Sequence, residues 1–352
     1  MKTTHLLLSA FLCFCTSLSK SQSHAHNTDN NASVSYPDVI AQYQELANKY
    51  PSAQLKEYGY ADGGKPIHLF VISPEKIFNI DSLKKNGYTI LLINNGIHPG
   101  EPDGIMASLR LSQDLLSGKE ILPKKVIVCI IPVYNIDGAL ETSLFFRSGQ
   151  NGPDVVGFRG NARHLDLNRD FIKCDSENAK TFTKIYRAWD PDVFIDTHVS
   201  DGADYQYVMT LIDSQKDKLH PTVSKVMQEK VLPFLYKEME KNGFPMTPYV
   251  NVWGDDPEVG MSGFLEPPRF ASGYSALYNA FPFVTETHML KPFAQRTEST
   301  YQFLRVALQL CAQYGNEIQS ARKTAKQQVA NEQLLFPLQW KLDSSFVDSI
   351  IF

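Results

Sequence analysis

Short runs of branched aliphatic residues recur along this chain, and segments of helical character separate them. The runs at 88–94 and 125–132 are nearly continuous in apolar residues, which is typical of strands buried on both faces of a sheet. Further strands are expected at 54–60, 66–73, 192–197, 205–212 and 281–287, and helices at 37–49, 101–117, 176–188, 219–241 and 294–322. Alternation of this kind predicts an α/β fold, a three-layer α/β/α sandwich around a mixed, mostly parallel central sheet.

Composition narrows the class of protein. The chain has 352 residues, of which 43% are hydrophobic, enough to bury a substantial core and to exclude an intrinsically disordered chain. A net charge of -4 without a basic block argues against a nucleic-acid surface. Five cysteines in this length are too few for a disulfide scaffold.

The first twenty-one residues have the order of a secretory signal peptide. A short start with one lysine precedes the apolar run from Leu6 to Cys15, and small polar residues follow. A membrane anchor is the weaker interpretation, because the run is about half a bilayer span. We therefore expect a signal peptide at 1–21, a disordered linker at 22–35 and a secreted or periplasmic protein without an integral membrane segment once the signal is removed.

The remaining chain divides into two parts. Residues 36–322 carry the strand and helix pattern and form the expected main domain. The pattern changes after about residue 322, where 336–340 and 346–352 are apolar strand-like stretches without partner strands. We expect 323–352 to be a C-terminal extension, and its pattern favours the start of a truncated β module. The oligomeric state is left open.

Metal-ligand residues follow two of the expected strands. His98 and Glu101 come just after the strand 88–94, and His198 ends the strand that begins near Asp192. Each alone is a weak signal, since an isolated histidine at a strand end is more often a core residue. Strand ends of an α/β sheet meet at one edge, however, and two His with one Glu leave a fourth position open for water. The pattern therefore favours a catalytic zinc site.

A polar and apolar alternation lies between these two motifs. Leu165 and Leu167 alternate with Asp166 and Asn168, and Arg169 follows. Asp166 could hold a ligating histidine by its second ring nitrogen. Asn168 and Arg169 together offer planar donors for a carboxylate. A solvated strand edge is the alternative for this segment taken by itself.

The combination of motifs resembles the zinc carboxypeptidase family, peptidase family M14, in a secreted bacterial-type form. The resemblance covers about residues 36–320. Four segments in the family's order carry it. His98-Pro99-Gly100-Glu101 resembles the HxxE zinc motif, and Asp166-Leu167-Asn168-Arg169 matches the D-x-N-R segment. His198 resembles the third zinc ligand, and Phe283-Val284-Thr285-Glu286-Thr287 resembles the strand with the catalytic Glu. Ile131–Gly138 also resembles the family's N-P-D-G turn, with Ile136 in place of the usual proline.

The resemblance implies a role for each matched residue. His98, Glu101 and His198 would bind one zinc ion per chain, and Glu286 would be the general base, with Glu266 or Glu258 next in line. Arg159 would stabilise the oxyanion, with Arg147 as the second choice, and Asn168 and Arg169 would bind the substrate carboxylate. Asp166 would orient His98. Tyr274 or Tyr278 would be the family's mobile-loop tyrosine, of which Tyr274 is our choice for substrate binding, and His288 would have a packing or supporting role.

The implied function is that of an exported zinc metallocarboxypeptidase. It would hydrolyse the C-terminal bond of a peptide with a free carboxylate, using a zinc-activated water and a glutamate general base. One alternative is a zinc amidase or deacylase of the same family acting on cell-wall peptides or N-acyl amino acids. Another is an inactive binding protein with the same fold. The strings H-E-x-x-H and G-x-S-x-G do not occur, which excludes two other hydrolase classes.

Overall fold

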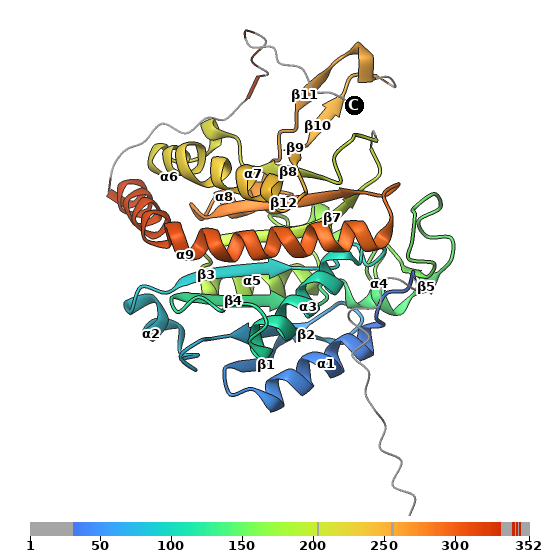
Figure 1. Cartoon of the computed structure of the whole chain (residues 1–352), viewed down its shortest axis with the longest axis horizontal. Helices are drawn as coiled ribbons and strands as arrows, with labels where there is room; N and C mark the ends of the chain where they lie inside the picture. Colours follow the sequence, from blue (N-terminus) through green and yellow to red (C-terminus); the bar gives the residue numbers. More distant parts are fainter. Residues whose placement is uncertain are drawn as a thin grey trace, which may run out of the picture.

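The computed structural model describes residues 31–202, 204–254, 257–331, 340, 341, 343 and 345. An eight-stranded sheet forms the centre, in the order β1-β2-β4-β3-β7-β12-β8-β9 (Figure 1). Its strands are β1 Ala53–Tyr60, β2 Pro66–Ile72, β3 Thr89–Asn94, β4 Val126–Ile131, β7 Val193–Ser200, β8 Met209–Asp213, β9 Met246–Pro248 and β12 Phe281–His288. Two small hairpin sheets pair β5 Thr142–Ser143 with β6 Val156–Gly157, and β10 Val250–Val252 with β11 Met261–Gly263.

The four central strands β4, β3, β7 and β12 are all parallel to one another, whereas β1, β2 and β8 pair with their inner neighbours antiparallel. Every residue of β3 and β4 is buried, as continuous aliphatic runs require when both faces of a sheet are covered. The expected mixed, mostly parallel sheet is therefore confirmed.

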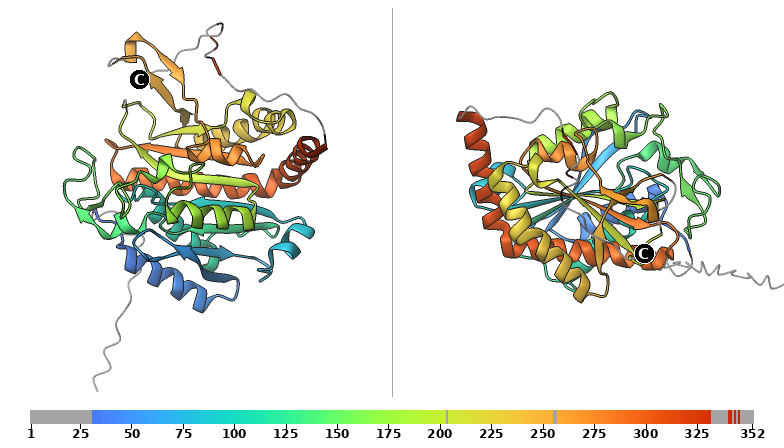
Figure 2. Two further views of the ribbon diagram at one scale, coloured as in Figure 1. Left: turned by 180° about the vertical axis from the view of Figure 1, so that it is seen from behind. Right: turned by 90° about the horizontal axis from the view of Figure 1, so that it is seen from above.

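Helices cover both faces of the sheet, and two hydrophobic cores result. One core holds apolar residues of α1 Tyr36–Lys49, α3 Asp103–Ser117, α6 Pro221–Val226, α7 Leu232–Lys241 and α9 Phe293–Asn331. The other holds residues of α2 Ile80–Lys85, α5 Glu177–Trp189 and α8 Ala271–Ala276. Figure 1 shows α9 crossing in front of the sheet, and the view from behind in Figure 2 brings α5 forward. The three expected layers are present.

Two helices differ from the sequence expectation. The helix expected at 219–241 is divided, because a π-helical turn at Met227–Val231 separates α6 from α7. The last helix, α9, continues to Asn331, past the boundary expected at residue 322. Arg322 is itself buried there and bonds to Asp190 and Asp192 beside the start of β7. Helix α9 is thus an integral part of the domain beyond that boundary.

The remaining terminal expectations fall mainly outside the described residues. This holds for the signal peptide, for most of the linker and for the β module. Residues 31–35 of the expected linker are described: Asn31 donates a 2.6 Å hydrogen bond to Asp154, and Ser35 caps α1. Within the described part of the chain, none of the helices combines the length and apolar character that a bilayer crossing needs.

A buried ion pair joins the layers close to the carboxyl edge of the sheet. Asp103, at the start of α3, accepts from Arg296 of α9 at 3.0 and 3.3 Å, and both side chains are almost fully buried. Thr287 of β12 donates to the same carboxylate at 2.6 Å. The Arg296 guanidinium also donates to the carbonyls of Asn151 and Gly152, so one pair connects two helices, a strand and a loop.

The first prediction concerns this pair. Arg296→Met leaves the Asp103 carboxylate buried without its counter-charge, which should lower the free energy of unfolding by about 3–5 kcal/mol. Arg305→Met is the matched control, because its pair with Glu120 is partly exposed and should contribute only about 0–1 kcal/mol. Urea unfolding measures both variants, and equal small losses would contradict the interpretation.

Candidate metal centre

Parallel pairing of β3 with β7 brings the two ligand segments together. Asn94 at the end of β3 lies opposite Asp196 of β7, so His98 and His198 both emerge at the same edge of the sheet. Glu101 follows within the turn that leads into α3. That helix packs very close to β7 at Gly104, where an added Cβ would lie 1.9 Å from the Thr197 hydroxyl. Only glycine permits this approach.

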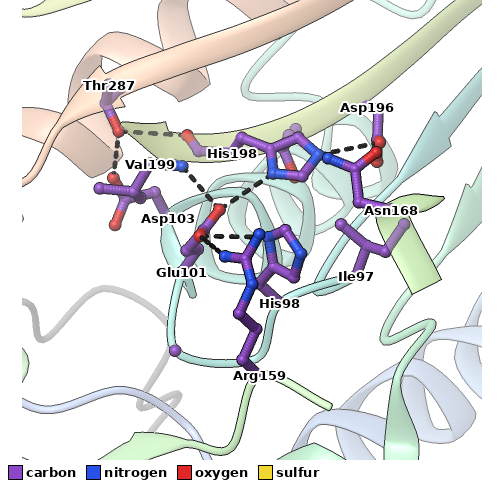
Figure 3. Close-up of polar contacts among 12 residues, drawn as sticks. Ile97, His98, Glu101, Asp103, Arg159, Asn168, Asp196, His198, Val199 and Thr287 are labelled. Carbon is purple, nitrogen blue, oxygen red and sulfur yellow. Dashed lines mark hydrogen bonds and ion pairs between the residues drawn. The ribbon is translucent and has the colours of Figure 1, made fainter. Parts of the chain in front are cut away.

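The three expected ligands form one buried cluster. A ring nitrogen of His98, one of His198 and a carboxylate oxygen of Glu101 lie within 4.8 Å of one another (Figure 3). The exposed fractions are 3% for His98 and Glu101 and 4% for His198. Glu101 lies between the imidazoles, 3.2 Å from His98 Nδ1 and 3.0 Å from His198 Nδ1.

Both imidazoles are held from their far side by a carboxylate. His98 Nε2 lies 2.9 Å from Asp166 Oδ1, and His198 Nε2 lies 3.0 Å from Asp196 Oδ2. When Nε2 carries the proton and donates to these carboxylates, the lone pair of each Nδ1 faces Glu101. His98 Nδ1 is buried and makes no hydrogen bond, in keeping with a ligand nitrogen.

The cluster requires positive charge at its centre. Burial alone would lower the pKa of His198, but Asp196 and Glu101 outweigh it and hold this pKa well above its usual value. Burial would raise the pKa of Glu101, but the charges of His98 and Arg147 hold it well below its usual value. A divalent cation would supply positive charge at the centre of the cluster. Two imidazole nitrogens with one carboxylate oxygen suit zinc. The residues present therefore fit a zinc ion.

Two arginines border the cluster in different ways. Arg147 donates to Glu101 Oε1 at 2.6 Å and to the Val199 carbonyl at 3.0 Å, so its guanidinium is paired within the protein. Arg159 bonds to Asp166 at 3.0 Å, lies 3.7 Å from Glu101 and is half exposed. Of these two arginines, Arg159 is the more exposed.

A cavity of about 540 Å³ opens over the cluster. Its lining comprises His98, Gly100, Phe146, Arg147, Ser148, Gly157, Arg159, Arg169, Asp201 and Met289. Asn168 and Arg169 form a short 3₁₀ turn capped by Asp166, and Arg169 stacks its guanidinium 4.5 Å from the Phe270 ring centre. The charged lining suits an anionic or strongly polar ligand.

Glu286 lies beside the cluster and outside it. It is paired with His198 in the parallel β7–β12 register, yet its carboxylate is not part of the three-ligand group. Burial, with Glu101 and Glu266 nearby and His198 in opposition, raises the pKa of Glu286 to about 8. The other two candidates lie differently: Glu266 is buried and accepts from the Ser272 backbone at 2.8 Å, and Glu258 is exposed.

The structure places the expected substrate tyrosine in a packed aromatic cluster. Tyr274 is 3% exposed on α8 and packs its ring against Phe182 and Tyr186, and its hydroxyl contacts that of Tyr278 at 3.1 Å. Tyr274 thus lies on a helix, and Tyr278 lies in the turn between that helix and β12. Neither belongs to the cavity lining given above.

Sequence reasoning missed two residues near the site and one contact of a third. Tyr249 is one: burial, with Glu286 and Asp201 nearby, raises the pKa of its phenol to about 12. Asp196 is another, and its spacing of two from His198 on one strand face was a readable signal. The third omission is the contact of Arg147 with Glu101, which only the folded loop reveals. His288 has the expected supporting role, since it bonds to the Gly202 carbonyl at 2.9 Å.

Comparisons with known proteins agree with this geometry. The sequence model of the zinc carboxypeptidase family matches residues 39–242, and no curated protein sequence matches the chain. A metallo-carboxypeptidase from Burkholderia cenocepacia has a similar fold, with a TM-score of 0.57 at 15% identity over 80% of this chain and 70% of that one. Carboxypeptidase A from Helicoverpa armigera gives 0.57 at 17% identity over 87% and 78%.

A metallo-carboxypeptidase from Pseudomonas aeruginosa, solved with (2-guanidinoethylmercapto)succinic acid, gives a TM-score of 0.56 at 15% identity over 79% of this chain and 68% of that one. At such identities the likeness shows the fold, whereas the sequence model covers more than half of the chain. The chain belongs to the zinc carboxypeptidase family, and it is thus a hydrolase of the metallopeptidase class.

The second prediction tests the metal centre. Protein dialysed after purification should retain about one zinc ion per chain, and His98→Ala should lose most of it because one of three protein ligands is removed. Elemental analysis measures the metal. His220→Ala is the control, since this histidine caps α6 away from the cluster and should leave the zinc content unchanged. Full retention in His98→Ala would remove His98 from the ligand set.

Proposed function

We propose that this chain is an exported zinc metallocarboxypeptidase that removes the C-terminal residue of peptides. The observation that carries the proposal is the place of Glu286, which is paired with His198 across β7 and β12 but does not belong to the ligand cluster. A carboxylate in that position can exchange protons with a water molecule at the metal without itself binding the metal. Export is inferred from the signal-like residues 1–21.

His98, Glu101 and His198 would hold the ion, with Asp166 and Asp196 fixing the two imidazole rings. Zinc, when bound, lowers the pKa of a water molecule and polarises the carbonyl of the scissile bond. Glu286 would accept the proton of the attacking water. It would then deliver that proton to the leaving amine, so that one group serves as base and acid in turn.

Two arginines would bind the two negatively charged parts of the substrate. Arg169, held over Phe270 with one nitrogen 2.8 Å from the Asn168 carbonyl, presents a fixed guanidinium plane to the cavity. A terminal carboxylate can accept two parallel hydrogen bonds from such a plane. Arg159, half exposed beside Asp166, is free to donate to the oxygen that gains negative charge during attack.

The third prediction separates metal binding from proton transfer. Glu286→Gln keeps the shape of the side chain and removes its basicity, so zinc content and stability should be preserved while the rate falls by about 10²–10⁴. Elemental analysis and peptide hydrolysis, measured on the same sample, give both quantities. Glu258→Gln is the matched control and should keep full activity. Normal turnover in Glu286→Gln would place the base elsewhere, with Glu266 the next to test.

The fourth prediction concerns the end of the peptide that is recognised. Amidation of the C-terminus removes the charge that Arg169 would bind, so we expect hydrolysis to fall by orders of magnitude on the amide. Arg169→Ala should lose a similar factor on the free acid. The two losses should not add, because each deletes the same interaction. Steady-state kinetics over the four combinations gives the coupling.

The amide experiment also separates the two kinds of enzyme within the family. Equal cleavage of the free acid and the amide would contradict an exopeptidase and favour an amidase or deacylase that uses the same metal site. Zinc binding without hydrolysis of any peptide or N-acyl amino acid would favour the inactive binding protein.

A further inference from the structure

Three consecutive apolar side chains are exposed at the tip of the loop between α4 (Ile136–Leu140) and β6. Leu144 is 62% exposed, Phe145 80% and Phe146 38%. An exposed run of this kind costs solubility and is rarely kept without a function. Figure 1 shows the loop, labelled β5, projecting beside the sheet.

The loop holds these side chains in a fixed position. Gln150 donates to the Gly100 carbonyl at 3.0 Å, and the Asn151 backbone donates to the Met289 carbonyl at 2.8 Å. Arg147 is fastened to Glu101, and the carbonyls of Asn151 and Gly152 accept from the buried Arg296. These bonds anchor the base of the loop next to the metal cluster, and the apolar side chains lie at its exposed end.

The exposed run continues into the metal cavity. Phe146 lines that cavity, and so does Met289, the other apolar side chain of the lining, which lies beside Gly149 of the same loop. The ring of Phe146 is supported from behind by Phe158, at 5.2 Å between ring centres. The rest of the lining is polar or glycine, so the apolar character of the cavity is concentrated at this side.

The two ring nitrogens of His98 distinguish the two sides of the cavity. Arg147, the neighbour of Phe146, contacts Glu101 on the Nδ1 side of that imidazole, whereas Asp166, which caps the turn carrying Arg169, contacts Nε2. A peptide whose terminal carboxylate is bound at Arg169 must cross the metal ligands. Its residues on the amino side of the scissile bond therefore leave the cavity past Phe146.

We propose that Leu144, Phe145 and Phe146, here called the apolar rim, bind an aromatic or branched aliphatic side chain on the amino side of the scissile bond. The enzyme would then prefer peptides that are apolar just before the C-terminal residue. This inference rests on the proposed carboxypeptidase function. The continuity of the rim with the metal cavity favours a peptide over a lipid surface or a second copy of the chain.

The test uses pairs of peptides that share one C-terminal residue and carry either Phe or Ser at the two positions before it. Wild-type protein should show a kcat/KM at least about tenfold higher for the Phe peptide, the size expected from covering part of one aromatic side chain. Phe145→Ser and Phe146→Ser should each reduce this ratio severalfold, and the double variant should remove most of it. Ile121→Ser is the matched control: Ile121 is 87% exposed, lies outside the cavity lining and should leave the ratio unchanged.

Each alternative gives a distinct result. Equal losses on the Phe and Ser peptides would overturn the proposal by showing a structural role only. The rim variants could instead leave the ratio unchanged. If they then lose liposome flotation, the proposal is overturned in favour of a lipid surface; if they lose concentration-dependent association, it is overturned in favour of a second copy. If the wild type removes no C-terminal residue from either peptide, the proposed function itself fails; if it cleaves both equally, only the rim proposal fails.

Discussion

The buried pair of Asp103 and Arg296 connects the parts of the chain that must stay in register for the site to exist. Asp103 begins the helix that follows the Glu101 turn, and Thr287 of the strand that carries Glu286 donates to the same carboxylate. Arg296 reaches the loop whose other end holds Arg147. Burying two charges is costly unless each is fully paired. Here the partners come from α3, β12, α9 and the loop at Asn151, so the pair is fully satisfied only when these elements are in place together.

The charged groups of the metal cluster are also buried, and each of them is paired with groups of opposite charge. Glu101 has guanidinium and imidazole groups around it, and each imidazole has a carboxylate behind it, so negative and positive groups alternate outward from the centre. The carboxylates behind the rings do more than balance charge, because they select the tautomer that turns a lone pair inward. Hydrogen bonds from outside the cluster thus fix the orientation of both imidazole ligands.

The sequence was sufficient to predict site residues whose position follows from a local rule. It was insufficient for residues whose position depends on tertiary packing. His98, Glu101 and His198 were predictable because the carboxyl ends of parallel strands share an edge. Asp166 was predictable from its place in a recognisable segment. The contact of Arg147 with Glu101 spans a long loop with no periodicity, so nothing in the sequence indicated it. The aromatic neighbours of Tyr274 on α5 become visible only once the helix is packed, so the sequence could not place this side chain.

Arg147 belongs both to the surroundings of the metal cluster and to the loop that carries the apolar rim. Its guanidinium contacts a carboxylate of the metal cluster, and its backbone carries the apolar run at the mouth of the cavity. Any change in the charge at the centre therefore alters the strength of a bond that fastens the wall of the cleft. By thermodynamic linkage, any factor by which a cation changes binding at this wall is the factor by which a ligand at the wall changes binding of the cation. Arg147 is the covalent and electrostatic route between the two places, because one residue contacts the metal cluster and belongs to the loop of the outer cleft.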